Sequence, residues 1–154
     1  MILIADIGST KGDWCLVDGD KFTSIQTLGF NPYTLSNEFL IEILKILNKK
    51  IDLNQVDQLF YYGAGCNNIK YKNLVKKILS EKLIYASIFV ESDLLAACRA
   101  TCGNKSGIVS ILGTGSNSCL YDGKKIMKKI DSLGYLFGDE GSGFEMGKNI
   151  FIKY

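Results

Sequence analysis

Short apolar runs alternate with helical patterns along the first two thirds of the chain. The runs predict strands over residues 1–7, 13–17, 22–28, 56–62 and 86–90. Ser36 is placed to cap a helix that runs to about Asn48, and further helices are expected over 69–82 and 92–101. Three strands followed by helix–strand alternation predict an α/β domain of order βββαβαβα, in which part of the sheet is parallel.

The strand pattern restarts after the polar segment 103–106. Strands are expected over 107–112, 116–121 and 124–130, and they repeat the opening three-stranded meander. We therefore predict a first domain over 1–105 and the beginning of a second copy over 106–154. A helical spacing of apolar residues continues to Tyr154, so we expect the second domain to be incomplete in this chain. Its apolar surface would pack either on the first domain or on another copy of the chain, and in the second case the protein would be a homodimer.

Each meander has a loop of glycines and hydroxyl residues after its first strand. The first loop contains Gly8, Ser9, Thr10 and Lys11, and the second contains Gly113, Thr114, Gly115 and Ser116. Glycine lets backbone N–H groups approach an anion closely, and the hydroxyls add donors. Two such loops predict that both bind one polyphosphate, each from its own side. For the first loop, the alternative is an ordinary hairpin whose turn is capped by Asp6.

The composition narrows the class of protein. The 154 residues are 47% hydrophobic and 22% charged, which is typical of a globular protein. The net charge of +2 is too small to indicate a nucleic-acid or membrane partner. No apolar run is long enough to cross a bilayer and no signal peptide is visible, so we expect a cytoplasmic protein.

The residues available for chemistry exclude several mechanisms. The chain has no histidine, so it can form neither a Ser-His-Asp triad nor a His-ligated metal site. Its five cysteines lack a CxxC pair, which favours reduced, mostly buried thiols.

Five segments together carry a family resemblance: DIGSTKGDW (6–14), GAGC (63–66), ESDLLAACRA (91–100), ILGTGSNS (111–118) and GDEGSGFEMGK (138–148). In this order they resemble the N-acetylglucosamine kinase branch of the BadF/BadG-type ATPase family. That family belongs to the actin-like ATPase superfamily of sugar kinases, Hsp70 and actin. The resemblance implies a ribonuclease-H-like domain followed by the start of a second copy.

The resemblance also implies roles for residues around the two loops. Both loops would contact the phosphates of ATP, and Asp6 would hold Mg²⁺ through water, which suits a cation that keeps its hydration. Asp93 would be the general base that accepts the proton of a sugar hydroxyl. Three residues would hold the sugar: Asn31, Asp139 and Glu140. The contacts to adenosine are expected beyond Tyr154.

The expected activity is ATP-dependent phosphorylation of an amino sugar, N-acetylglucosamine at its 6-hydroxyl, and the isolated chain is expected to have little of it. From position alone, a helix N-cap formed by Ser92 or Asp93 is the better interpretation, and only the family resemblance favours a base at Asp93. Asn31 is equally well explained as a loop residue before proline. Family members often have Trp-Gly where this chain has Gly134-Tyr135.

Two other functions are compatible with the sequence: an ATPase activator of a 2-hydroxyacyl-CoA dehydratase, and a sugar sensor without turnover. Such activators usually have Gly-Gly-Gln-Asp at positions 113–116.

Overall fold

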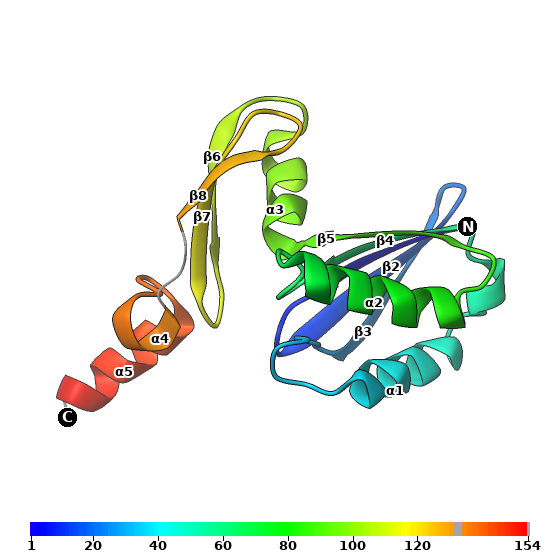
Figure 1. Cartoon of the computed structure of the whole chain (residues 1–154), viewed down its shortest axis with the longest axis horizontal. Helices are drawn as coiled ribbons and strands as arrows, with labels where there is room; N and C mark the ends of the chain where they lie inside the picture. The colour runs from blue at the N-terminus through cyan, green and yellow to red at the C-terminus, as the bar shows by residue number, and fades with distance from the viewer. Residues whose placement is uncertain (131–133, 154) are drawn as a thin grey trace. The chain divides into compact units, whose positions relative to one another are not determined.

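The chain forms two compact units, Met1–Asp93 and Leu94–Tyr154. The computed structural model describes residues 1–130 and 134–153 (Figure 1). Each unit is described by itself below.

The first unit is a five-stranded sheet with two helices on one face (Figure 1). Its strands are β1 (Ile2–Ile7), β2 (Lys11–Asp18), β3 (Lys21–Leu28), β4 (Gln58–Gly63) and β5 (Ser87–Ser92), in the order β3-β2-β1-β4-β5. The meander β1–β3 is antiparallel, whereas β4 and β5 extend the sheet parallel to β1. The helices are α1 (Asn37–Asn48) and α2 (Ile69–Lys82), and a 3₁₀ turn, η1 (Leu53–Gln55), precedes β4.

Buried and exposed residues alternate along the strands, and the buried positions define the face of the sheet that forms the core. In β1, Leu3, Ala5 and Ile7 are buried while Ile2 and Ile4 are exposed. The buried set packs with the apolar stripe of α1, formed by Leu40, Ile43, Leu44 and Leu47, and with Val75, Ile78 and Leu79 of α2. This arrangement fixes the register of the strands, because a slip of one residue would turn the core side chains outward.

The second unit contains a three-stranded antiparallel sheet. Its strands are β6 (Gly107–Leu112), β7 (Ser116–Tyr121) and β8 (Ile126–Ile130), in the order β6-β7-β8. The helices of this part are α3 (Asp93–Cys102), α4 (Gly134–Phe137) and α5 (Gly143–Lys153). Both meanders thus have a glycine loop between their first two strands.

The units divide after Asp93, whereas the sequence repeat placed the division after residue 105. The reason is the packing of α3. Its buried residues Leu94 and Cys98 form one cluster with Val109, Cys119 and Tyr121 of the second sheet. The sulfur atoms of Cys98 and Cys119 lie 3.3 Å apart inside this cluster.

The predicted α/β fold is confirmed, and most predicted elements are found within one or two residues of their expected bounds. The four-residue helix α4 was not predicted. The last strand begins at Ile126 rather than Lys124, because Asp122 Oδ1 accepts hydrogen bonds from the N–H groups of Lys124 and Lys125 and holds them in a turn.

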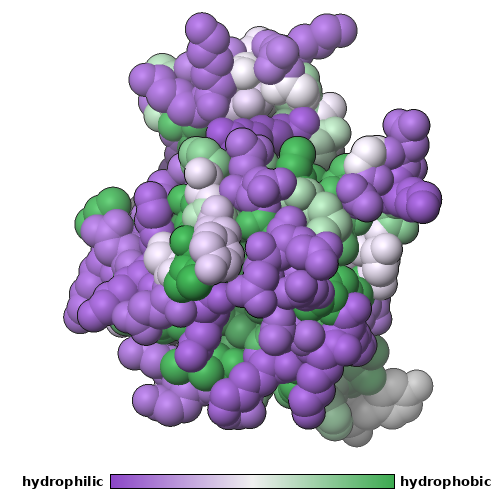
Figure 2. Space-filling model, turned by 90° about the vertical axis from the view of Figure 1, so that its right-hand side faces the viewer, coloured by the Kyte–Doolittle hydropathy of each residue, from purple (hydrophilic) through white to green (hydrophobic). Residues whose placement is uncertain are grey.

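The face in Figure 2 is mainly hydrophilic, with hydrophobic residues in small areas between the hydrophilic ones. None of the described helices is both long and apolar enough to span a membrane.

Candidate functional site

The carboxyl ends of three parallel strands bring the first set of predicted residues to one sheet edge. Asp6 of β1 is in register with Tyr62 of β4, which is in register with Glu91 of β5. Asp93 follows two residues after Glu91. Because β5 ends at Ser92 and α3 begins at Asp93, no loop residue separates the strand from the helix. Neighbouring strands lie about 4.8 Å apart, so the backbones of Asp6 and Glu91 are separated by about two strand spacings, and Asp93 lies two residues further along the chain.

Three carboxylates concentrate negative charge at this edge. Burial raises the pKa of Asp6, and the negative charges of Asp93 and Asp13 raise it further, while Lys11 opposes the shift. A divalent cation would relieve this repulsion. No three His, Cys, Asp or Glu side chains of residues 1–130 and 134–153 are placed to hold a metal ion together. A hydrated Mg²⁺ ion, which keeps several waters and needs only one or two carboxylates, is the kind of cation that such a sparse set of protein oxygens could hold.

The first glycine loop is a tight turn held by the segment after β3. Gly8 N–H donates to Lys11 O over 2.9 Å, Phe30 N–H to Gly8 O over 3.0 Å, and Gly29 N–H to Thr10 O over 3.0 Å. A Cβ on Gly29 would lie 2.2 Å from Gly8 O and 2.6 Å from Lys11 N. Only glycine fits there, because backbone atoms on the other side cannot move away cheaply.

Lys11 begins β2 rather than lying inside the turn. Its Nζ lies 3.0 Å from Asp13 Oδ2, and this hydrogen bond lowers the pKa of the Asp13 carboxyl. Both side chains are largely exposed, so the pair adds little stability.

Asn31 joins the same loop from the other side. Its Nδ2 donates to Ser9 Oγ over 3.1 Å, and its Oδ1 accepts from Tyr33 N–H over 3.0 Å. A Cβ on Gly65, which has φ +75°, would come within 2.9 Å of Asn31 Oδ1. Asn31 therefore lies between the loop after β1 and the turn after β4.

A buried thiol lies near Asp93. Cys66 follows the glycines of the turn after β4, and a Cβ on Gly63 would lie 3.1 Å from its sulfur. Burial, with a contribution from the charge of Asp93, raises the pKa of Cys66 to about 12. The thiol is therefore protonated at neutral pH and is no nucleophile there.

The second glycine loop is held by a carboxylate from the turn before α5. Ser116 N–H donates to Asp139 Oδ1 over 3.1 Å, and a Cβ on Gly115 would lie 3.1 Å from both carboxylate oxygens. Gly113 N–H bonds Gly115 O, and Gly143 N–H bonds Gly113 O, each over 2.9 Å. The structure thus places Asp139 against the predicted phosphate loop.

The residues after Asp139 start helix α5. Ser142 is fully buried, its Oγ accepts from Glu145 N–H over 3.1 Å, and Glu145 Oε2 accepts from Gly141 N–H over 2.5 Å. The Ser142 hydroxyl thus satisfies a free N–H in the first turn of α5, and the Glu145 carboxylate satisfies an N–H of the turn before the helix. Glu140 lies in this turn and is exposed.

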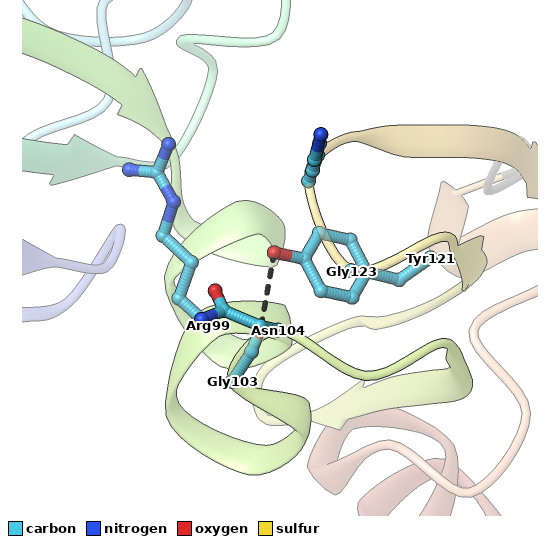
Figure 3. Close-up of a pocket in the computed structure, with 6 residues that line it drawn as sticks. Arg99, Gly103, Asn104, Tyr121 and Gly123 are labelled. Atoms are coloured by element: carbon cyan, nitrogen blue, oxygen red, sulfur yellow. Dashed lines mark hydrogen bonds between the residues drawn. The ribbon is translucent and has the colours of Figure 1, made fainter.

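A hollow of about 340 Å³ in the second unit contains none of the predicted site residues (Figure 3). It is lined by Arg99, Gly103, Asn104, Tyr121, Gly123 and Lys124. The Tyr121 hydroxyl points to the turn after α3 and donates to Gly103 O over 3.3 Å (Figure 3). The hollow lies at the opposite end of β7 from the glycine loop.

The predicted residues thus form two groups. Asp6, the first loop, Asn31 and Asp93 share one edge in the first unit, and the second loop contacts Asp139 in the second unit. The sequence analysis missed Gly29 and gave no structural role to Gly65 of the GAGC segment, because the atoms that crowd these glycines come from distant parts of the chain. The Gly-Phe-Asn-Pro run after β3 was the only local signal for Gly29.

Comparison with solved structures identifies proteins of the same fold. The chain matches a proposed N-acetylglucosamine kinase from Porphyromonas gingivalis with 40% identity and a TM-score of 0.90, over 99% of this chain and 55% of the other. A proposed N-acetylglucosamine kinase from Chromobacterium violaceum matches with 17% identity and a TM-score of 0.68, over 96% and 54%. The ROK hexokinase of Thermus thermophilus matches with 16% identity and a TM-score of 0.52, over 90% and 50%.

The chain belongs to the superfamily of sugar kinases and actin-like ATPases. It spans about half the length of the three proteins above. No protein-family model matches the chain, and no curated protein is similar to it.

Proposed function

We propose that this chain is the catalytic half of a kinase that transfers the γ-phosphoryl group of ATP to an amino sugar, N-acetylglucosamine, at its 6-hydroxyl. The observation that carries the proposal is the sheet edge where Asp6, the first glycine loop, Asn31 and Asp93 meet. The 40% identity to a proposed N-acetylglucosamine kinase supports the substrate class.

Phosphoryl transfer needs positioned groups more than covalent help from the protein. Mg²⁺ and ATP supply the phosphoryl group and neutralise its charge when they are bound. The hydroxyls of Ser9 and Thr10, with backbone N–H groups of the loop other than that of Gly8, would bind phosphate oxygens, and Asp6 would bind a water of the metal ion. In the second unit, Gly113 to Ser116 would bind phosphate in the same way.

The sugar hydroxyl needs a base at the same edge. Asp93 is held at the junction of β5 and α3, and its carboxylate would accept the proton as the sugar oxygen attacks. The Asn31 carboxamide would orient the sugar. That Asp139 and Glu140 bind sugar hydroxyls stays a prediction from the sequence; within the second unit, the Asp139 carboxylate accepts a hydrogen bond from Ser116 N–H.

The test begins with an NMR titration of the chain with N-acetylglucosamine, glucosamine and glucose, and then with MgATP. We expect N-acetylglucosamine to shift the resonances of Asn31 and Asp93, and MgATP to shift those of residues 8–10. If MgATP shifts the first loop but no sugar has any effect, the proposed substrate class is wrong and an activator-type ATPase becomes the better explanation.

Turnover is tested with radiolabelled ATP and the same sugars. Asp93→Asn should abolish the phosphate transfer that the wild-type protein shows, however slow, and preserve sugar binding, because the amide keeps the shape of the side chain and cannot act as the base. The matched control is Glu81→Gln, which removes a charge from the exposed side of α2. Sugar binding by a wild-type protein that shows no detectable transfer would favour a sugar sensor.

A further inference from the structure

Two tyrosines beside Asn31 form an aromatic pair. Tyr33 comes from the segment after β3 and Tyr71 from the first turn of α2, and their ring centroids lie 4.2 Å apart with the planes inclined by 45°. Tyr71 is half-buried, but Tyr33 keeps 52% of its surface exposed. A ring that is fixed on one side and open on the other is a ready platform for an apolar surface.

The pair is tied to the first glycine loop through Asn31. Tyr33 N–H donates to Asn31 Oδ1 over 3.0 Å, and Asn31 Nδ2 donates to Ser9 Oγ over 3.1 Å. A Cβ on Gly65 would lie 2.9 Å from both Asn31 Oδ1 and Tyr33 Cδ2. The ring and the carboxamide therefore contact the same glycine, and the lack of a side chain at position 65 lets them lie side by side.

The chemistry of these neighbours is complementary to a sugar. The carboxamide of Asn31 has two donor hydrogens and two acceptor lone pairs, and the two bonds above use one of each. Among the residues that the structure describes, these are the carboxamide's two hydrogen bonds, so one donor and one acceptor are left for hydroxyl groups. A pyranose ring presents apolar C–H groups on its face and hydroxyls around its edge, so it can contact an aromatic ring and an amide at the same time.

We propose that Tyr33, held in place by Tyr71, is a binding residue of the sugar site whose ring stacks on the C–H face of the pyranose while Asn31 binds a hydroxyl at its edge. The proposal rests on the proposed function, because it requires a sugar at this edge of the sheet. It differs from a merely structural role, in which the ring pair only fastens the segment after β3 to α2.

Three variants separate these roles. Tyr33→Leu keeps an apolar side chain against Tyr71 but has no aromatic face, Tyr33→Phe keeps the ring and loses the hydroxyl, and Tyr85→Leu changes a distant exposed tyrosine as a control. Affinities for N-acetylglucosamine and glucose would be measured by calorimetry. The Asn31 side-chain resonances of the free proteins would report whether the loop is intact.

We expect Tyr33→Leu to lower the affinity for both sugars by about tenfold and Tyr33→Phe to lower it by less than about twofold. Tyr85→Leu should leave both affinities unchanged. An unchanged affinity in Tyr33→Leu would overturn the stacking proposal and leave the proposed function standing. A loss confined to N-acetylglucosamine would also overturn it, because the ring would then contact the acetamido group instead of the ring face.

The remaining outcomes are equally decisive. If Tyr33→Leu displaces the Asn31 resonances without ligand, Tyr33→Trp decides: its larger ring should bind both sugars at least as tightly as the wild type, and a weakened affinity contradicts stacking. If the wild-type protein binds none of the sugars, this proposal and the proposed function both fail.

Discussion

The carboxylate of Asp139 accepts a hydrogen bond from the backbone N–H of Ser116 over 3.1 Å, and so fastens the turn before α5 to the second glycine loop. Asp139 reaches this position with φ +65°, a left-handed conformation that few residues other than glycine, asparagine and aspartate adopt readily. The second loop is thus held by an anion of the protein itself, and a phosphate bound at the same N–H would have to share or replace it.

Asp139→Ala should loosen the second loop. The Ser116 N–H loses an ionised acceptor, so we expect its amide hydrogen to exchange about ten- to a hundredfold faster. Asp139→Asn is the matched control, because asparagine tolerates the same backbone conformation and keeps an acceptor oxygen. Equal exchange rates in Asp139→Ala and the wild type would show that the bond does not hold the loop in solution.

Gly29→Ala should destabilise the first unit. Its new methyl group would overlap backbone atoms of the first glycine loop, at 2.2 Å from Gly8 O, so we expect a loss of about 3 kcal/mol in the free energy of unfolding by urea. Gly19→Asn is the control, because Gly19 has φ +56° and open space around it. A Gly29→Ala protein as stable as the wild type would contradict the close approach.

Asp6→Asn should stabilise the protein at neutral pH in the absence of metal. A carboxyl whose pKa is raised by folding binds protons more tightly in the native state, so stability falls as the pH rises from the usual range of aspartate through the raised pKa. The asparagine side chain of the variant carries no charge, so its folding is not penalised at neutral pH in this way. Urea unfolding at pH 3 and pH 7 should show a gain for the variant only at pH 7.

At pH 7, excess Mg²⁺ should make the wild type more stable to urea than Asp6→Asn. The ion would bind the native wild type through Asp6, and the variant lacks this carboxylate. Asp20→Asn, in the exposed β2–β3 turn, should show neither effect. A wild type that is insensitive to Mg²⁺, with and without ATP, would argue against a metal at Asp6.

Two buried thiols should resist modification. Burial raises the pKa of Cys66 to about 12, and burial together with Cys119 raises that of Cys98 to about 12. The thiolate is the reactive form, so the reaction of both with a disulfide reagent should be slow at pH 8 and still increase with pH above 10. The urea-unfolded protein, in which all five cysteines should react quickly, is the control. Fast labelling of Cys66 at pH 8 in the native protein would contradict its burial.

Local patterns of apolar and polar residues were sufficient to predict the helices and strands and the positions of both glycine loops. The strands around Gly8 and Gly113 and the stripe of α1 follow from alternation and helical spacing, since these depend on near neighbours in the chain. The position of Asp93 after a buried strand also follows from the sequence. The superfamily was predicted from the resemblance of five ordered segments to a known family, and the repeat of two meanders with glycine loops at corresponding places agreed with it.

Only the tertiary structure decided which segments meet. The contact of Asn31 with Ser9, the fit of Gly29 against Gly8, and the bond of Asp139 to Ser116 each join residues about twenty or more positions apart. The assignment of α3 to the second unit depends on Cys98 and Cys119 in the same way. Such contacts depend on the register and packing of whole elements, which a local pattern of apolar and polar residues does not specify.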